Sequence, residues 1–225
     1  MTERDPTRDR IQSWRVDELL EKYSGLRLVP TRGEGLKLAG PITFSAQARD
    51  LQSITDEYQV EITVPPEFPR AVPAVRETAG RIPPTYHTLA DGTLCLGSPT
   101  RLRLIAWESR SLSRFVERCV IPYLYGRSYF EKHGVMPFGE LAHGDDGIRE
   151  DLAAIFGVDG RCDLDDFVRL AAMRRREANK QPCPCGSGRR LGRCHNRRVN
   201  TLRGRLGRQW FRASLGWLRR TPRTQ

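Results

Sequence analysis

The stretch that decides the fold is an alternating segment that runs into a proline turn, Tyr58-Gln59-Val60-Glu61-Ile62-Thr63-Val64-Pro65-Pro66-Glu67-Phe68-Pro69. Every second side chain from Tyr58 to Val64 is apolar, which directs one face of a strand towards a core. Pro65 and Pro66 lack the N–H group that a paired strand needs, so the strand ends there. This stretch predicts one strand of a half-buried antiparallel sheet.

The segments around this strand extend the sheet. Residues 26–29 and 36–46 have strand character, and residues 68–75 read as a turn that leads into a last short strand. Pro41 predicts that segment 36–46 forms two pieces or an edge strand. Residues 11–23 have the spacing of an amphipathic helix. A helix followed by hairpin-linked strands predicts an α+β fold with an antiparallel sheet.

Residues 80–107 are expected to be mostly irregular, and they contain the first candidate site. His87 and Cys95 stand eight positions apart, with Asp91-Gly92 between them. The thiolate is the nucleophilic form of cysteine, and a histidine beside it can take a proton or donate a hydrogen bond to an oxyanion. The spacing alone also fits a buried structural cysteine.

Helical patterns follow at 111–121, where Pro122 interrupts the pattern, at 148–156, and from Leu164 to about Ala178. Asp163 is the expected N-cap of the third helix. Cys119 falls in an apolar stripe and is expected in the core, while Cys162 receives no role. His133 and His143 are interpreted as structural histidines.

A second candidate site is a metal centre, in which Cys183, Cys185, Cys194 and His195 form the pattern C-x-C-x8-C-H. Thiolate and imidazole are preferred zinc ligands, and four of them close a tetrahedral structural site. So short a segment has no core of its own, so the metal is expected to supply its folding energy. The pattern resembles the SEC-C motif, which implies a recognition module for protein partners or ribosomes.

The positive charge is concentrated at the C-terminal end. The chain has a net charge of +11, and 13 of its 38 Lys and Arg residues lie from Lys180 onwards, where no Asp or Glu occurs. Residues 202–219 have the pattern of a basic amphipathic helix. Such a helix fits docking on the protein's own body, or binding to an acidic partner, an anionic surface or nucleic acid.

No apolar run is long enough to form a transmembrane segment. The polar first residues do not resemble a secretory signal. A cytoplasmic protein is therefore expected.

The order of these elements resembles the ubiquitin-conjugating (UBC) enzymes over about residues 10–130. That family has a strand ending in a Phe-Pro or Tyr-Pro turn, as at Val64–Pro69, with Pro73 where a later proline falls. Its Gly-x-[Ile/Leu]-Cys-Leu matches Gly92–Leu96, and Trp107 is the candidate for its downstream tryptophan. The resemblance implies a UBC-like fold with a four-stranded meander, an active-site loop and C-terminal helices.

The resemblance also implies an activity. Cys95 would carry the C-terminal acyl group of a protein modifier as a thioester and pass it to the amine of a protein target. The family's His-Pro-Asn tripeptide is Thr85-Tyr86-His87 here, so His87 stands where the family has asparagine. Bacterial UBC-like proteins of CBASS antiphage operons resemble this chain, which implies that the modifier is a cGAS-like nucleotidyltransferase.

Two routes to the thioester stay open. The sequence shows no glycine-rich nucleotide loop, so a separate activating enzyme would deliver the modifier. Alternatively, Cys95 attacks a peptide bond near the C-terminus of the modifier directly, without ATP.

The sequence thus divides into a conjugating domain (1–145), a helical extension (146–179), a zinc-binding motif (180–199) and a basic tail (200–225). A non-catalytic adaptor that binds an acidic protein, nucleic acid or ribosome is the alternative function.

Overall fold

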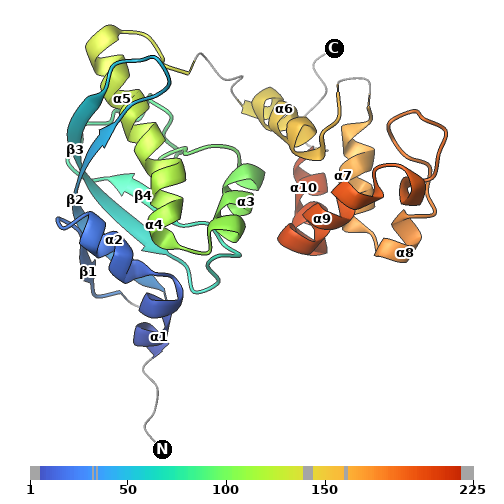
Figure 1. Ribbon diagram of the computed structural model, residues 1–225, viewed down its shortest axis with the longest axis horizontal. Coiled ribbons are helices and arrows are strands. Elements are labelled where there is room, and N and C mark those ends of the chain that lie inside the picture. The colour runs from blue at the N-terminus through green and yellow to red at the C-terminus, as the bar shows by residue number, and fades with distance from the viewer. Residues whose placement is uncertain (1–5, 32, 34, 139–143, 160–161, 219–225) are drawn as a thin grey trace, which may run out of the picture. The chain divides into compact units, whose positions relative to one another are not determined.

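The computed structural model describes residues 6–31, 33, 35–138, 144–159 and 162–218 (Figure 1). The chain forms two compact units. Unit 1 comprises Met1–Ser98 and Ile105–Leu141, and unit 2 comprises Pro99–Leu104 and Ala142–Gln225. Each is described by itself.

Unit 1 is built on a four-stranded antiparallel sheet. Its strands lie in chain order, as a meander: β1 (Arg27–Val29), β2 (Leu36–Ala46), β3 (Ile54–Val64) and β4 (Ala74–Glu77). The alternating residues of β3 that the sequence singled out are buried on one face, as expected: Tyr58, Val60, Ile62 and Val64. The predicted α+β class with an antiparallel sheet is therefore confirmed.

Pro41 neither divides β2 nor places it at an edge, so that prediction is wrong. β2 runs for 11 residues without a break and lies between β1 and β3. The physical reason is the length of β1, which pairs only with Lys37, Leu38 and Ala39. Beyond Ala39 one side of β2 has no strand partner, so a missing N–H there removes no ladder bond.

The predicted N-terminal helix is two helices, α1 (Pro6–Ser13) and α2 (Val16–Lys22). They separate at Arg15, which has a left-handed φ of 53°. The break lets Trp14 turn inwards, where its ring meets the edge of Phe68 at a centroid distance of 5.6 Å. The Trp14 carbonyl accepts a hydrogen bond from the Leu112 amide at 2.8 Å, which ties the break to the next helical segment.

Two further predictions about helices are corrected. Residues 99–107, part of the segment expected to be mostly irregular, belong to α3 (Pro99–Ser109). Pro122 does not end the helix before it: α4 (Leu112–Phe115) continues through a π-helical turn (Val116–Val120) into α5 (Ile121–His133). The wider π turn bonds the Ile121 amide to the Val116 carbonyl, and Pro122 then occupies the first turn of α5, where no N–H partner is needed.

Unit 2 is helical. Its elements are α6 (Gly144–Phe156), α7 (Leu164–Ala172), α8 (Arg175–Ala178), a 3₁₀ turn η2 (Leu191–Arg193), α9 (Asn196–Leu206) and α10 (Arg208–Leu218). Asp163 caps α7 as predicted, accepting a hydrogen bond from the Asp166 amide at 3.1 Å. The predicted single helix 164–178 is instead two, because Met173 leaves the helical conformation.

The helical extension, the zinc motif and the basic tail share one core in this unit. Phe156, Phe167, Leu191 and Phe211 are all buried in it. The sequence patterns indicate separate parts and predict that residues 181–199 have no core of their own. In the structure, these residues instead contribute to the shared core. The basic tail bends at Gly207 and docks on its own unit, with α10 against α7.

Among the described residues, no helix is long and apolar enough to cross a membrane.

Candidate functional sites

The loop that carries Cys95 is a small hairpin held by its own backbone. Thr88 and Leu94 form an antiparallel bridge, and the same register places His87 opposite Cys95. The Cys95 amide donates to the His87 carbonyl at 2.7 Å. The Leu94 amide donates to the carbonyl of Val75 at 2.8 Å, which joins the hairpin to β4. The backbones of the two predicted catalytic residues therefore lie opposite each other, next to this bridge.

The tip of the hairpin is shaped by Asp91 and Gly92. One carboxylate oxygen of Asp91 accepts from the Thr93 amide at 3.0 Å and from the Thr93 hydroxyl at 2.6 Å. These hydrogen bonds lower the pKa of the Asp91 carboxyl. Gly92 has a φ of +83°, which residues with a side chain rarely adopt. The Asp-Gly pair therefore closes the turn that returns the chain to Cys95.

The Cys95 thiol is exposed, whereas Cys119 is only 4% exposed. Cys119 is the buried structural cysteine that the sequence predicted. The alternative that Cys95 is also a buried structural cysteine does not hold, because Cys95 is exposed. Cys95 instead presents its thiol to solvent from a backbone that is fully hydrogen-bonded at its amide. This is the geometry that a nucleophile requires.

Sequence reasoning missed Tyr123, near the start of α5. Its hydroxyl donates towards the Tyr86 carbonyl at 3.0 Å and the His87 carbonyl at 3.3 Å. Burial raises the pKa of Tyr123, and the neighbouring Cys95 acts in the same direction. Nothing in the sequence marks Tyr123, because its relation to the loop exists only once α5 packs beside it.

A charged network behind the loop holds α5 to the sheet. The Arg81 guanidinium donates to both Asp56 oxygens at 2.9 and 2.7 Å and to Glu131 of α5 at 2.6 Å. Ser128 of α5 donates to Asp56 at 2.7 Å. The hydrogen bonds from Arg81 lower the pKa of Asp56 to about 2. Arg81 also lies over the Tyr58 ring at 4.1 Å, so the network connects β3, the segment before the loop and α5.

The remaining candidates of unit 1 lie outside the Cys95 hairpin. Trp107 belongs to α3, half-buried, with the Arg110 guanidinium 4.9 Å from its ring centre. His133 lies at the end of α5, with its Nε2 3.1 Å from the Gln52 side-chain oxygen. This contact fits the predicted structural role. His143 lies outside the described residues.

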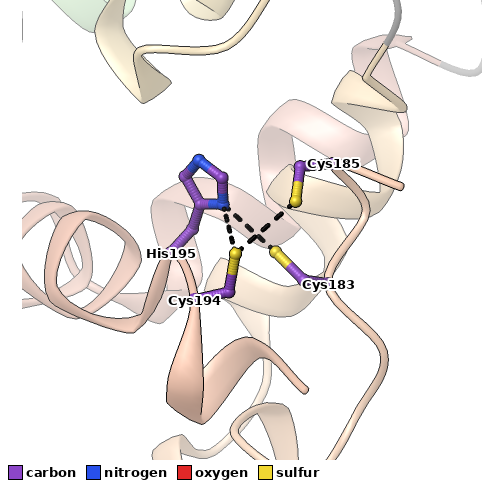
Figure 2. Close-up of side chains that lie close together, drawn as sticks. All are labelled: Cys183, Cys185, Cys194 and His195. Atoms are coloured by element: carbon purple, nitrogen blue, oxygen red, sulfur yellow. Dashed lines mark hydrogen bonds between the residues drawn. The ribbon is translucent and has the colours of Figure 1, made fainter. Parts of the chain in front are cut away.

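The structure brings the four predicted metal ligands together in unit 2 (Figure 2). Their ligand atoms all lie within 4.8 Å of one another: Cys183 Sγ, Cys185 Sγ, Cys194 Sγ and a His195 ring nitrogen. The His195 Nδ1 atom lies 3.2 Å from Cys183 Sγ and 3.3 Å from Cys194 Sγ. The remaining sulfur, of Cys185, lies 3.6 Å from Cys194 Sγ.

The local fold explains this convergence. The Cys183 amide donates to the Arg189 carbonyl at 2.8 Å, which closes the loop between them. Gly186 and Gly188 have φ values of +75° and +69°, which permit the reversal. The His195 ring meets the edge of Phe167 at 5.3 Å, so the ligand set is joined to the core of the unit.

The ligand set fits zinc. A tetrahedral site with Zn–S bonds of about 2.3 Å separates two thiolate sulfurs by about 3.8 Å, close to the 3.6 Å found here. The hydroxyl of Ser187 lowers the pKa of Cys185, which favours the thiolate that binds metal. Three sulfurs and one nitrogen satisfy four-coordinate zinc, so the cluster is compatible with a closed structural site.

Comparison with known proteins identifies one part of the chain. Residues 180–197 match the SEC-C motif, which confirms the resemblance seen in the sequence. The match contains all four clustered side chains. The chain matches no curated protein and no solved structure.

Proposed function

We propose that this protein is a UBC-like acyl carrier, in which Cys95 forms a thioester with the C-terminus of a protein modifier and passes it to an amine. The observation that carries the proposal is the exposed Cys95 thiol in a loop whose backbone places His87 directly opposite. The four-stranded meander between N-terminal helices and this loop has the order that the family resemblance implies. The fold assignment to the UBC family belongs to the same proposal.

The reaction has two steps. In the first, the Cys95 thiolate attacks the activated carbonyl carbon of the modifier, a C–S bond forms, and the former acyl carrier departs. In the second, a target amine attacks that carbon, the C–S bond breaks, and the amine proton leaves to a base. A thioester keeps the acyl group reactive towards amines, which suits a carrier that must release it again.

His87 is proposed to serve both steps. An imidazole donates a hydrogen bond to the oxyanion that develops on the carbonyl oxygen, and unlike an amide it also accepts the proton of the amine. The backbone carbonyl of His87 accepts a hydrogen bond from the Cys95 amide, so the backbones of the two residues move together. This is how His87 would replace the asparagine of the family.

The proposed modifier is a cGAS-like nucleotidyltransferase in antiphage defence, and this rests on the resemblance to CBASS proteins alone. A separate activating enzyme would supply the activated C-terminus. Direct attack of Cys95 on a precursor peptide bond is the second route, and it predicts an adduct without ATP.

The SEC-C unit is proposed to bind structural zinc through Cys183, Cys185, Cys194 and His195 and to recognise an acidic partner. Zinc would supply a fixed tetrahedral junction between the loop and the helical core. Around this junction five arginines are exposed: Arg189, Arg190, Arg193, Arg197 and Arg198. The same observation favours the alternative function, a non-catalytic adaptor that uses this surface without any reaction at Cys95.

The test uses a Cys95→Ser protein, because an oxyester is more stable than a thioester and accumulates. Cells that produce this variant together with a cGAS-like nucleotidyltransferase and an activating enzyme should yield a covalent adduct on residue 95, identified by mass spectrometry. Cys95→Ala should form no adduct and no conjugates, whereas Cys162→Ala, the matched control, should conjugate normally. Normal conjugation by Cys95→Ala would overturn the proposal and leave the adaptor function.

A further inference from the structure

His87 has an unusual backbone conformation. Its φ is +40°, in the left-handed region that residues with large side chains seldom enter. Such a conformation persists only where surrounding contacts hold it, and it concentrates at functional sites. The contacts that hold the segment 86–88 therefore determine the direction of the His87 side chain relative to Cys95.

Three hydrogen-bond donors reach the Tyr86 and His87 carbonyls of this segment. The Cys95 amide donates to the His87 carbonyl at 2.7 Å, and the Thr88 hydroxyl donates to the Tyr86 carbonyl at 2.9 Å. Both donors belong to the hairpin itself. The third donor, the Tyr123 hydroxyl, comes from α5 and reaches both carbonyls, at 3.0 and 3.3 Å.

We propose that Tyr123 is a positioning residue for the Cys95–His87 pair, and that its hydroxyl fixes the peptide planes on both sides of the His87 side chain. This inference rests on the proposed function of that pair. Tyr123 is the one of the three donors that does not move with the hairpin, so, together with the Leu94–Val75 hydrogen bond, it sets the orientation of the pair relative to the body of unit 1. The Tyr123 hydroxyl and the Cys95 amide both donate to the His87 carbonyl oxygen, so the two donors lie close to each other.

A replacement by phenylalanine separates positioning from folding. The Tyr123 ring packs against the Tyr86 ring at 5.9 Å, and phenylalanine keeps that contact. Each carbonyl also keeps one donor, Thr88 or Cys95, so neither is left without a partner. What the substitution removes is the pair of hydrogen bonds from α5 to the Tyr86 and His87 carbonyls. Tyr129→Phe on the same helix is the matched control, because that ring contacts Tyr125 and His133 and not the hairpin.

The experiment measures the rate at which iodoacetamide alkylates Cys95 in the full zinc-loaded chain, followed by mass spectrometry of the peptide that contains it. Tyr123→Phe should slow alkylation about threefold to tenfold, the effect of one hydrogen bond. In a His87→Ala background the same substitution should change the rate less than twofold, because two residues that act as a unit are not additive. Tyr129→Phe should leave the rate unchanged in both backgrounds.

Two results for Tyr123→Phe would overturn the inference: an unchanged alkylation rate, or an equal slowing with and without His87, which would mean that Tyr123 only stabilises the fold. A His87→Ala protein that alkylates like the wild type would overturn the pairing as well. The alkylation probe needs no modifier, so it tests Tyr123 independently of acyl transfer. If the effects of Tyr123→Phe and His87→Ala on the alkylation rate are not additive but Cys95→Ser forms no adduct, the role of Tyr123 stands and only the acyl-transfer function is rejected.

Discussion

Cys95 and the cluster of Cys183, Cys185, Cys194 and His195 use the same kind of side chain in opposite ways. The cluster gathers three sulfurs and a nitrogen around one point, so each thiol is committed to its neighbours. Cys95 has its backbone amide bound and its thiol exposed. The neighbours of each cysteine therefore distinguish the proposed metal ligands from the proposed nucleophile.

The two sites also differ in how far along the chain their contacts reach. The ligands of the cluster lie within thirteen positions, from Cys183 to His195. The hairpin of Cys95 depends on Val75 in β4 and on Tyr123 in α5. Local sequence is sufficient to indicate the first site, whereas the second is complete only in the folded unit.

Loss of a metal ligand is expected to have the largest effect. Cys183 is 5% exposed and belongs to the core of unit 2, so Cys183→Ser should lose the zinc and destabilise that unit by on the order of 5 kcal/mol, a part of the binding free energy of structural zinc. The zinc content per chain, measured by mass spectrometry of the metal, should fall from about one to near zero. The amides of α7 and α9 should lose hydrogen-exchange protection.

Cys162→Ser is the control for this prediction, because Cys162 lies outside the ligand set and is only partly buried. It should retain the zinc and the exchange protection. A Cys183→Ser protein with full zinc content would show that the cluster is not the metal site. Protection of the β3 amides in unit 1 should be the same in all three proteins.

Acid should act on unit 1 through Asp56, with a smaller effect. Its pKa in the folded protein is about 2, below the ordinary 3.8, because Arg81 and Ser128 favour the carboxylate. Its contribution is therefore complete above pH 4 and is lost as the pH falls towards 2. The shift corresponds to about 2 kcal/mol. Hydrogen exchange of β3 amides should show this difference between wild type and Asp56→Asn at pH 6, and the difference should shrink below pH 4.

Glu61→Gln serves as the comparison, since Glu61 forms an ion pair with the partly exposed Lys37 at 3.0 Å, and partly exposed pairs of this kind contribute little. Its β3 protection should follow the wild type at every pH. A constant difference between Asp56→Asn and wild type from pH 6 to pH 2 would contradict the role of the Asp56 carboxylate.

Much of unit 1 could be predicted because its signals are local. Apolar residues at every second position of β3 can bury only one face, and the structure buries that face. The prediction that Pro41 divides β2 or places it at an edge was wrong. A proline disrupts a strand only where a neighbouring strand needs its N–H, and the pairing with β1 ends before Pro41. Pro122 misled for a similar reason, since a π turn before it removes the need for its missing N–H.

The docking of the tail could not be read from amphipathicity. A stripe with Leu202 and Leu206 fits a partner helix as well as the protein's own core, and only the tertiary structure distinguishes them. The cost of ordering a helix is recovered wherever its apolar face is buried. Here α7 supplies that surface.

The smallest expected effect concerns Cys119, the third environment for a thiol in this protein. Burial raises its pKa to about 11, so at pH 8 almost none of it is thiolate. Iodoacetamide should therefore label Cys95 in the folded protein and leave Cys119 unmodified, as read from the two peptides by mass spectrometry. Cys119→Ala removes one sulfur from a packed position and should cost about 1 kcal/mol while the Cys95 rate stays the same. If Cys119 reacted as fast as Cys95 in folded protein, exposure of the thiol would no longer separate the nucleophile from the core. Only its neighbours His87 and Tyr123 would then distinguish Cys95 from Cys119.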